Sequence, residues 1–135
     1  MVVDTSALLA ILLGEPEAEA LVRALASAEH AVVGAPTLVE ASAVMRARKG
    51  PGGEIALDAL LERIGITVQA FSVDQARMAR LGYGRFGKGV GDPAVLNLGD
   101  CFSYGTAMAL RQPLLCKGDD FARTDVELVS HQATG

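Results

Sequence analysis

Acidic side chains occupy the four positions at which this chain could do chemistry. Each lies where an apolar, strand-like run gives way to a helical pattern, or within the first turn of that helix: Asp4, Glu40, Asp100 and the pair Asp119 and Asp120. In a fold that alternates strands and helices, such junctions lie along one edge of the sheet, so we expect these side chains to converge. Clustered carboxylates resist ionising together unless a cation holds them, and oxygen ligands suit Mg²⁺ or Mn²⁺. The sequence therefore predicts a hard-metal site.

Helix capping is the alternative explanation for each acid. Asp4 and either member of the last pair are suitable N-caps, and Asp100 suits a helix start through the helix dipole. Thr37 and Glu40 fit the capping-box pattern Thr-x-x-Glu. Helix starts also accept Ser, Thr, Asn and Gly, yet acids stand at all four junctions. Because gathering four charges destabilises a fold unless something cationic binds, the pattern favours the metal site.

Polar neighbours of these acids are candidate contacts for the metal site or for an anionic substrate. Thr5 and Ser6 directly follow Asp4, and Asn97 lies three residues before Asp100. Their side chains are able to bond to a carboxylate, to metal-bound water or to a phosphate. The whole chain has a net charge of −4, but residues 45–90 hold an excess of Lys and Arg over acids. The overall charge therefore does not exclude an anionic substrate.

The apolar pattern predicts the elements that must position these acids. The chain has 135 residues, of which 50% are hydrophobic, and is expected to form a single domain over residues 1–135. We expect strands at residues 1–3, 31–33, 66–71, 114–116 and 126–129. We expect helices at residues 5–13, after Pro16, at 38–48, around 55–64, at 73–81, at 98–111 and at 119–122, with a mobile glycine-rich loop at 82–91. This order predicts a three-layer α/β/α domain with a central, mostly parallel sheet of four to five strands.

The cysteines and the apolar runs indicate the cellular compartment in which the protein is expected. Cys101 and Cys116 form no metal-ligand motif and are expected to be reduced and buried. The longest apolar run, residues 7–13, is too short to span a bilayer, and no signal-peptide pattern is visible at the start. We therefore expect a cytoplasmic protein with no membrane partner.

Three stretches of the sequence resemble a known family. They are Val-Asp-Thr-Ser-Ala at 3–7, Leu-Asn-Leu-Gly-Asp-Cys-Phe-Ser-Tyr at 96–104 and Pro-Leu-Leu-Cys-Lys-Gly-Asp-Asp-Phe-Ala-Arg-Thr-Asp at 113–125. Together with Glu40 inside its helix, they resemble PIN-domain ribonucleases, and among these the VapC toxins of bacterial type II toxin–antitoxin pairs. The resemblance covers the whole chain, and three motifs in order are more specific than any one of them.

This resemblance implies an endoribonuclease that cleaves RNA at a Mg²⁺ or Mn²⁺ site and leaves a 5′-phosphate. Asp4, Glu40 and Asp100 match the family's metal-holding acids directly, with Glu40 either a ligand or the general base. The fourth acid is Asp119 or Asp120, and we expect Asp119. The hypothetical phosphate contacts are the basic residues Arg46, Arg48, Lys49, Arg85 and Lys88.

The resemblance also implies two protein partners, a second copy of the chain in a homodimer and a cognate antitoxin. The antitoxin segment is expected in an apolar groove near the active site. The early helices supply candidate groove residues: Leu8, Leu9, Ile11, Leu12, Leu21 and Leu25.

Two other classes of protein place acids at the ends of parallel strands. A phosphoacceptor receiver domain needs an acidic pair after the first strand, and here only Lys117 fits its pattern. A haloacid-type phosphatase needs Asp-x-Asp, which Ser6 breaks. A catalytically silent metal-binding domain, which binds RNA or protein without cleavage, is the remaining alternative.

Overall fold

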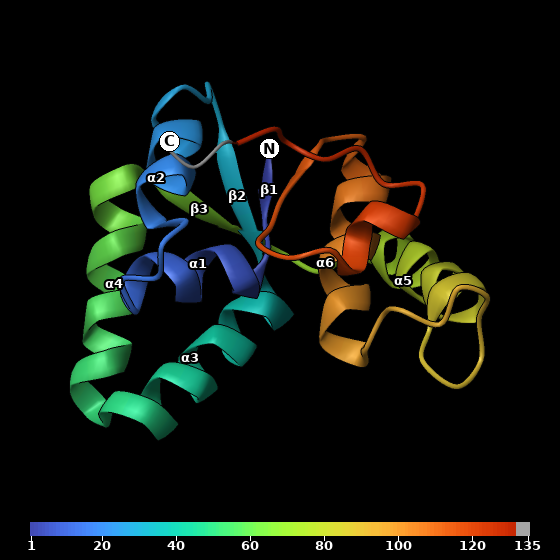
Figure 1. The fold of residues 1–135 in the computed structure, drawn as a ribbon, viewed down its shortest axis with the longest axis horizontal. Helices are drawn as coiled ribbons and strands as arrows, with labels where there is room; N and C mark the ends of the chain where they lie inside the picture. Colours follow the sequence, from blue (N-terminus) through green and yellow to red (C-terminus); the bar gives the residue numbers. More distant parts are fainter. Residues whose placement is uncertain (132–135) are drawn as a thin grey trace.

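The computed structural model describes residues 1–131 of the chain. Four parallel strands form one sheet in the order β3-β2-β1-β4. Their bounds are β1 (Val2–Val3), β2 (Ala31–Gly34), β3 (Ile66–Gln69) and β4 (Leu114–Leu115). Val2 pairs with Val32 on one side and with Leu114 on the other, so the first strand lies inside the sheet. Because all four strands run the same way, their carboxyl ends meet at one edge (Figure 1).

Helices cover both faces of this sheet (Figure 1). Four helices lie on one side: α1 (Thr5–Leu12), α2 (Ala18–Ala26), α3 (Ala35–Lys49) and α4 (Pro51–Ile64). Two helices lie on the other side, α5 (Val73–Phe86) and α6 (Leu98–Leu110), with the short 3-10 helix η1 (Asp120–Arg123) beside them. The predicted three-layer α/β/α arrangement with a parallel central sheet is confirmed.

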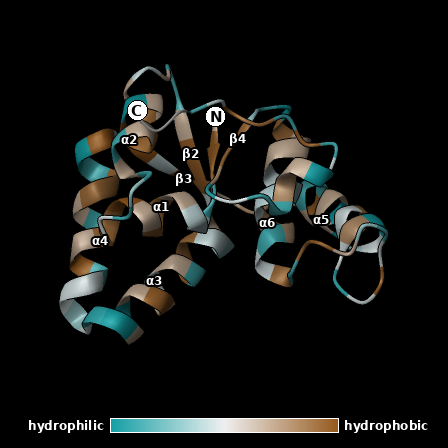
Figure 2. Ribbon diagram, in the orientation of Figure 1, coloured by the Kyte–Doolittle hydropathy of each residue, from teal (hydrophilic) through white to brown (hydrophobic). Residues whose placement is uncertain are grey.

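Alternating side chains of the strands supply the two cores. Val3 and Leu115 pack with the residues of α1 to α4, whereas Val2 and Leu114 pack with those of α5 and α6. This alternation follows from the period of two in a strand. Strands β1, β2 and β4 are largely apolar, as their brown colour in Figure 2 shows, and this is typical of a buried parallel sheet. The edge strand β3 differs, since it includes the polar residues Thr67 and Gln69.

The prediction of a glycine-rich loop at residues 82–91 was wrong in its first half. Helix α5 continues through Gly82 and Gly84 to Phe86, and the connecting segment begins at Gly87. Gly82 is buried against the ring of Tyr104, where an added Cβ would overlap the ring carbons. This glycine therefore permits the close approach of α5 and α6. In the sequence, the tendency of glycine to interrupt helices favoured a loop at this position instead.

The predicted fifth strand at residues 126–129 is also absent from the described residues. Leu128 forms only an isolated parallel bridge with Leu114, supported by hydrogen bonds between Leu114 N and Glu127 O and between Val129 N and Leu114 O. Residues 126–129 therefore contact β4 (Leu114–Leu115) through one bridge and add no further strand to the sheet. In the described part of the chain, no helix has the length and apolar character needed to cross a membrane.

Candidate metal centre

Asp4 follows β1 directly and serves as the N-cap of α1. Its side chain is 3% exposed. Oδ2 accepts hydrogen bonds from the backbone N of Ser6 at 3.0 Å and from Ser6 Oγ at 2.7 Å. Oδ1 accepts a hydrogen bond from Ser103 Oγ of α6 at 2.5 Å. All these partners are neutral, so within residues 1–131 this buried carboxylate has no protein cation among its hydrogen-bond donors, a condition that favours a bound metal ion.

Glu40 lies on the second turn of α3 and points back toward Thr5, the neighbour of Asp4. Thr5 Oγ1 donates to Glu40 Oε1 at 2.5 Å. Helix α3 starts at Ala35 with Gly34 as its N-cap, three residues earlier than the sequence suggested. The alternative explanation of Glu40 by a capping box with Thr37 is therefore excluded, since both residues already lie inside the helix. Glu40 instead belongs to the acidic cluster.

Asp100 stands in the first turn of α6, where a real capping box forms. Its backbone N donates to Asn97 Oδ1 at 2.8 Å, and its Oδ2 accepts from Asn97 N at 3.0 Å. Burial raises the pKa of Asp100 to about 6, and the charges of Asp4, Asp120 and Glu40 add to this rise, whereas the hydrogen bond from Asn97 N opposes it. The charges of acids on three further elements thus act on Asp100, while a shared metal site of these acids stays a prediction.

The last acids lie after β4, near η1. Asp119 is the N-cap of this short helix and Asp120 its first residue, and both are exposed. Burial raises the pKa of the Cys116 thiol to about 12, and the negative charges of the acids around it contribute: Asp4, Asp100, Asp120 and Asp119. The charge of Asp120 acts on Asp100 as well.

The carboxylates share one region but are turned apart. Within residues 1–131, no three His, Cys, Asp or Glu side chains already stand close enough to hold a metal ion together. Glu40 is drawn toward Thr5, and Asp100 is folded back onto Asn97. Mutual repulsion of like charges favours this separation, and a divalent cation would reverse it. The donor set contains only oxygen atoms, which are the ligands that Mg²⁺ and Mn²⁺ prefer.

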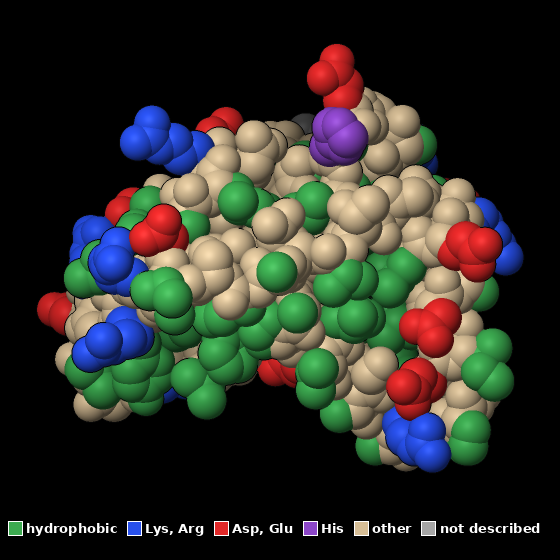
Figure 3. All heavy atoms as spheres, turned by 180° about the vertical axis from the view of Figure 1, so that it is seen from behind, with side chains coloured by type: hydrophobic (Ala, Val, Ile, Leu, Met, Phe, Trp, Pro, Cys, Tyr) green, Lys and Arg blue, Asp and Glu red, His purple; other side chains and the backbone are tan. Residues whose placement is uncertain are grey.

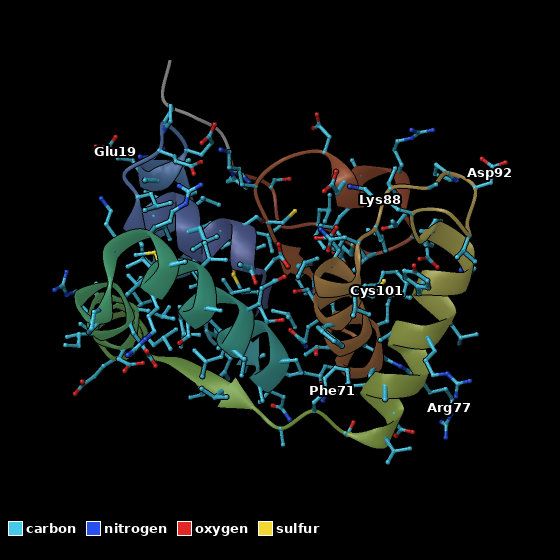
Figure 4. All side chains as sticks on the ribbon, turned by 90° about the horizontal axis from the view of Figure 1, so that it is seen from below. Glu19, Phe71, Arg77, Lys88, Asp92 and Cys101 are labelled. Carbon is cyan, nitrogen blue, oxygen red and sulfur yellow. The ribbon has the colours of Figure 1, made fainter. Side chains whose placement is uncertain are left out.

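The surface around the acids is hollowed. Figure 3, seen from behind, shows a concave lower margin between the part formed by α3 and α4 and the part formed by α5 and α6, with an acidic side chain at its floor. Figure 4 looks onto the same edge, where side chains of α1, α3 and α6 meet in the middle of the view. A substrate backbone would therefore reach the carboxylates from this edge of the sheet.

Several predicted basic contacts lie outside this cluster. Arg46 pairs with Glu54 at 2.9 Å on the hairpin of α3 and α4. Arg85 pairs with Asp125 at 2.9 Å and lies over the ring of Phe86. Lys88 is exposed on the segment that follows α5 (Figure 4). Arg46 and Arg85 are thus engaged in surface ion pairs. Each side chain would have to leave its acidic partner before it could bind a phosphate.

The structure adds two residues that the sequence interpretation missed. Ser103 donates to Asp4, and its spacing of three residues from Asp100 would have placed it on the same helix face. Gly99 lies against Glu40, since a Cβ built there would stand 2.7 Å from Glu40 Cδ. No pattern in the sequence indicates this second contact, because it depends on how α3 packs against α6.

Comparisons with known proteins agree with this geometry. The PIN domain family matches residues 1–127. Ribonuclease VapC42 of Mycobacterium tuberculosis is 45% identical over 126 residues, which cover 93% of this chain and 96% of that protein. The crystal structure of M. tuberculosis VapC20, described as a sarcin-ricin loop cleaving toxin, has a TM-score of 0.76 at 19% identity and covers 95% of this chain and 97% of that one. A toxin–antitoxin complex from Klebsiella pneumoniae has a TM-score of 0.69 at 21% identity, with 95% of each chain covered. The chain therefore belongs to the PIN domain family, among relatives named VapC ribonucleases.

Proposed function

We propose that this chain is a metal-dependent endoribonuclease and the toxic component of a type II toxin–antitoxin pair. The observation that carries the proposal is the carboxylate of Asp4, which is buried at the end of β1 and accepts hydrogen bonds only from the neutral donors Ser6 and Ser103 among residues 1–131. Its relatives named VapC ribonucleases support RNA as the substrate. Because such RNA lies in the cytoplasm, we propose that the protein acts there.

Asp4, Glu40, Asp100 and one of the last two acids are the proposed ligands. Electrostatics support Asp120 as this fourth acid over Asp119, which the sequence had favoured. Thr5 donates to Oε1 of Glu40, which leaves Oε2 for the cation or for a proton taken from the attacking water. When bound, a divalent cation would lower the pKa of that water and stabilise charge on the phosphodiester oxygens. Ser6 Oγ and the backbone N of Asn97 donate to the carboxylates of Asp4 and Asp100, and this supports a role of both residues in holding these acids.

Removal of divalent ions is expected to abolish RNA cleavage. Exhaustive treatment with EDTA leaves the acids without the cation that they require, and Mg²⁺ or Mn²⁺ should restore activity, because these hard ions prefer oxygen ligands. The measurement is cleavage of total RNA, with the new 5′ ends sequenced to locate the cut. Activity that persists after chelation would contradict the proposal, and Mn²⁺ binding without cleavage would favour the catalytically silent domain.

We also propose an antitoxin partner, supported by the likeness to a toxin–antitoxin complex. The groove predicted from the early helices needs revision, since Leu8, Leu21 and Leu25 are buried in the core. Leu9, Ile11 and Leu12 are only partly buried and remain candidates for contact with an antitoxin segment.

A homodimer through α5 and α6 is the second proposed assembly. Val73 is 77% exposed, Leu81 52% and Leu98 64%. Leu98 lines an apolar cavity of about 390 Å³ between these helices, together with Phe71, Phe102 and neighbouring residues, and Val73 and Leu81 are exposed on α5. A two-fold axis beside this cavity would cover these apolar side chains with a second copy of the chain.

Gel filtration at micromolar concentration is expected to give twice the chain mass of 14.0 kDa. Leu81→Asp should shift the protein to the monomeric mass, because it places a charge in the contact. Val39→Asp on α3, another exposed apolar position, is the control and should stay dimeric. A monomeric wild-type protein would refute the proposal.

A further inference from the structure

Two chains of hydrogen bonds end on the two oxygens of Asp4. Ser6 gives its hydroxyl proton to Oδ2, and its oxygen accepts from Lys117 N at 2.9 Å. Ser103 gives its proton to Oδ1, and its oxygen lies 3.2 Å from Thr37 Oγ1. The directions follow from the charge, because an ionised carboxylate only accepts hydrogen bonds. Ser103 therefore donates to Asp4 and receives the proton of Thr37.

The number of acceptor positions on Asp4 then decides which oxygen faces a cation. Each carboxylate oxygen has about two acceptor positions. Oδ2 uses both of them for the backbone N and the hydroxyl of Ser6. Among residues 1–131, Oδ1 uses one for Ser103 and retains one. The free position of Asp4 is thus next to Ser103, which lies on the same helix as Asp100.

We infer that Ser103 is a positioning residue, which fixes Asp4 so that Oδ1 alone binds the divalent cation. Ser103 and Thr37 are each 1% exposed, so neither hydroxyl faces bulk solvent. Their chain links α3, α6 and the start of α1, the three elements that carry Glu40, Asp100 and Asp4. This inference rests on the proposed metal-dependent function and assigns the orientation of one ligand within it.

The test compares Ser103→Ala with Thr106→Val. Thr106 lies one turn later on α6, is fully buried, and donates to Gln75 Oε1 at 2.8 Å. Both variants lose one buried hydroxyl on the same helix, but only Ser103 contacts an acid of the cluster. Isothermal titration of Mn²⁺ should show the dissociation constant of Ser103→Ala raised about 10-fold or more, the effect typical of losing a residue that orients a metal ligand.

The kinetic constants give a second readout. Ser103→Ala should lower kcat about 10-fold or more and leave the KM for RNA unchanged, because the substrate contacts remain. Thr106→Val should lower the melting temperature without changing Mn²⁺ affinity or kcat. If Ser103→Ala melts without a cooperative transition, Thr37→Val serves instead. It keeps Ser103 but removes its donor and should weaken Mn²⁺ binding a few-fold.

Each result decides a different point. Wild-type Mn²⁺ affinity and kcat in Ser103→Ala, or in Thr37→Val where that variant is used, would make Ser103 structural only and overturn the inference. Weakened Mn²⁺ binding in a protein whose wild type cleaves no RNA would support the inference and refute the proposed nuclease. A wild type that binds no Mn²⁺ would refute both.

Discussion

Replacing Asp4 or Asp100 by Asn is expected to lower RNA cleavage by about 100-fold or more, because a bound cation contributes several kcal/mol to the transition state. Asn is nearly the same size as Asp, so packing is preserved. In the Asp100→Asn variant, the amide oxygen can still accept the hydrogen bond that Asn97 N gives to the Asp100 carboxylate. Initial rates on a defined RNA with saturating Mg²⁺ would measure the loss. Asp58→Asn, the same change at an exposed site on α4, is the matched control and should keep full activity.

The stability of the Asp100 variant separates lost chemistry from lost folding. The pKa of Asp100 is raised from 3.8 to about 6 in the folded protein, so folding favours its protonated form. Its contribution to stability is present below about pH 4 and is lost as the pH rises through about 6. In metal-free buffer at pH 7, Asp100→Asn should therefore melt at or above the temperature of the wild type. Melting far below the wild type would mean that the variant is inactive because it is unfolded, and full metal-dependent cleavage by both variants would remove the site assignment.

The sequence predicted the layers and the acids because both depend on local patterns. Apolar runs such as 1–3 and 31–33 set the strands, and parallel topology alone brings the residues after them to one edge. Features that depend on contact between helices were not predictable. Gly82 was interpreted as a loop residue, although it is buried against Tyr104 within α5. Its role appears only when α5 and α6 are placed side by side.

The same limit applies within the site. Thr37 and Glu40 matched a capping box by spacing, but their partners lie on α6 and α1. Asn97 and Asp100 have equal spacing and do form a capping box. Spacing within one helix therefore could not distinguish a helix cap from a member of the acidic cluster, since the difference depends on which other elements pack against it.

Gly99→Ala is expected to lower RNA cleavage about 10- to 100-fold while leaving the fold at least as stable, because a displacement of about 1 Å in an active site has an effect of this size. Gly99 is the second residue of α6, where Ala normally stabilises a helix by about 0.5–1 kcal/mol. Here the added Cβ would lie 2.7 Å from Glu40 Cδ and 2.9 Å from Oε1. Glu40 must move away, and the hydrogen bond from Thr5 is then lost. Cleavage rates and thermal melting of the same sample would give both quantities.

Gly52→Ala is the matched control for this prediction. Gly52 is also the second residue of its helix, α4, and a Cβ there meets no atom within 4 Å. Both substitutions add one methyl group to the first turn of a helix. They differ in that the methyl group at Gly99 meets Glu40, whereas the one at Gly52 meets no atom. Gly52→Ala should keep full activity and match or exceed the wild type in stability. Full activity in Gly99→Ala would contradict a catalytic role for Glu40 in its observed position. Loss of activity without loss of stability would support a role of Glu40 in the reaction. If Glu40 were purely structural, its displacement would lower the activity and the melting temperature together.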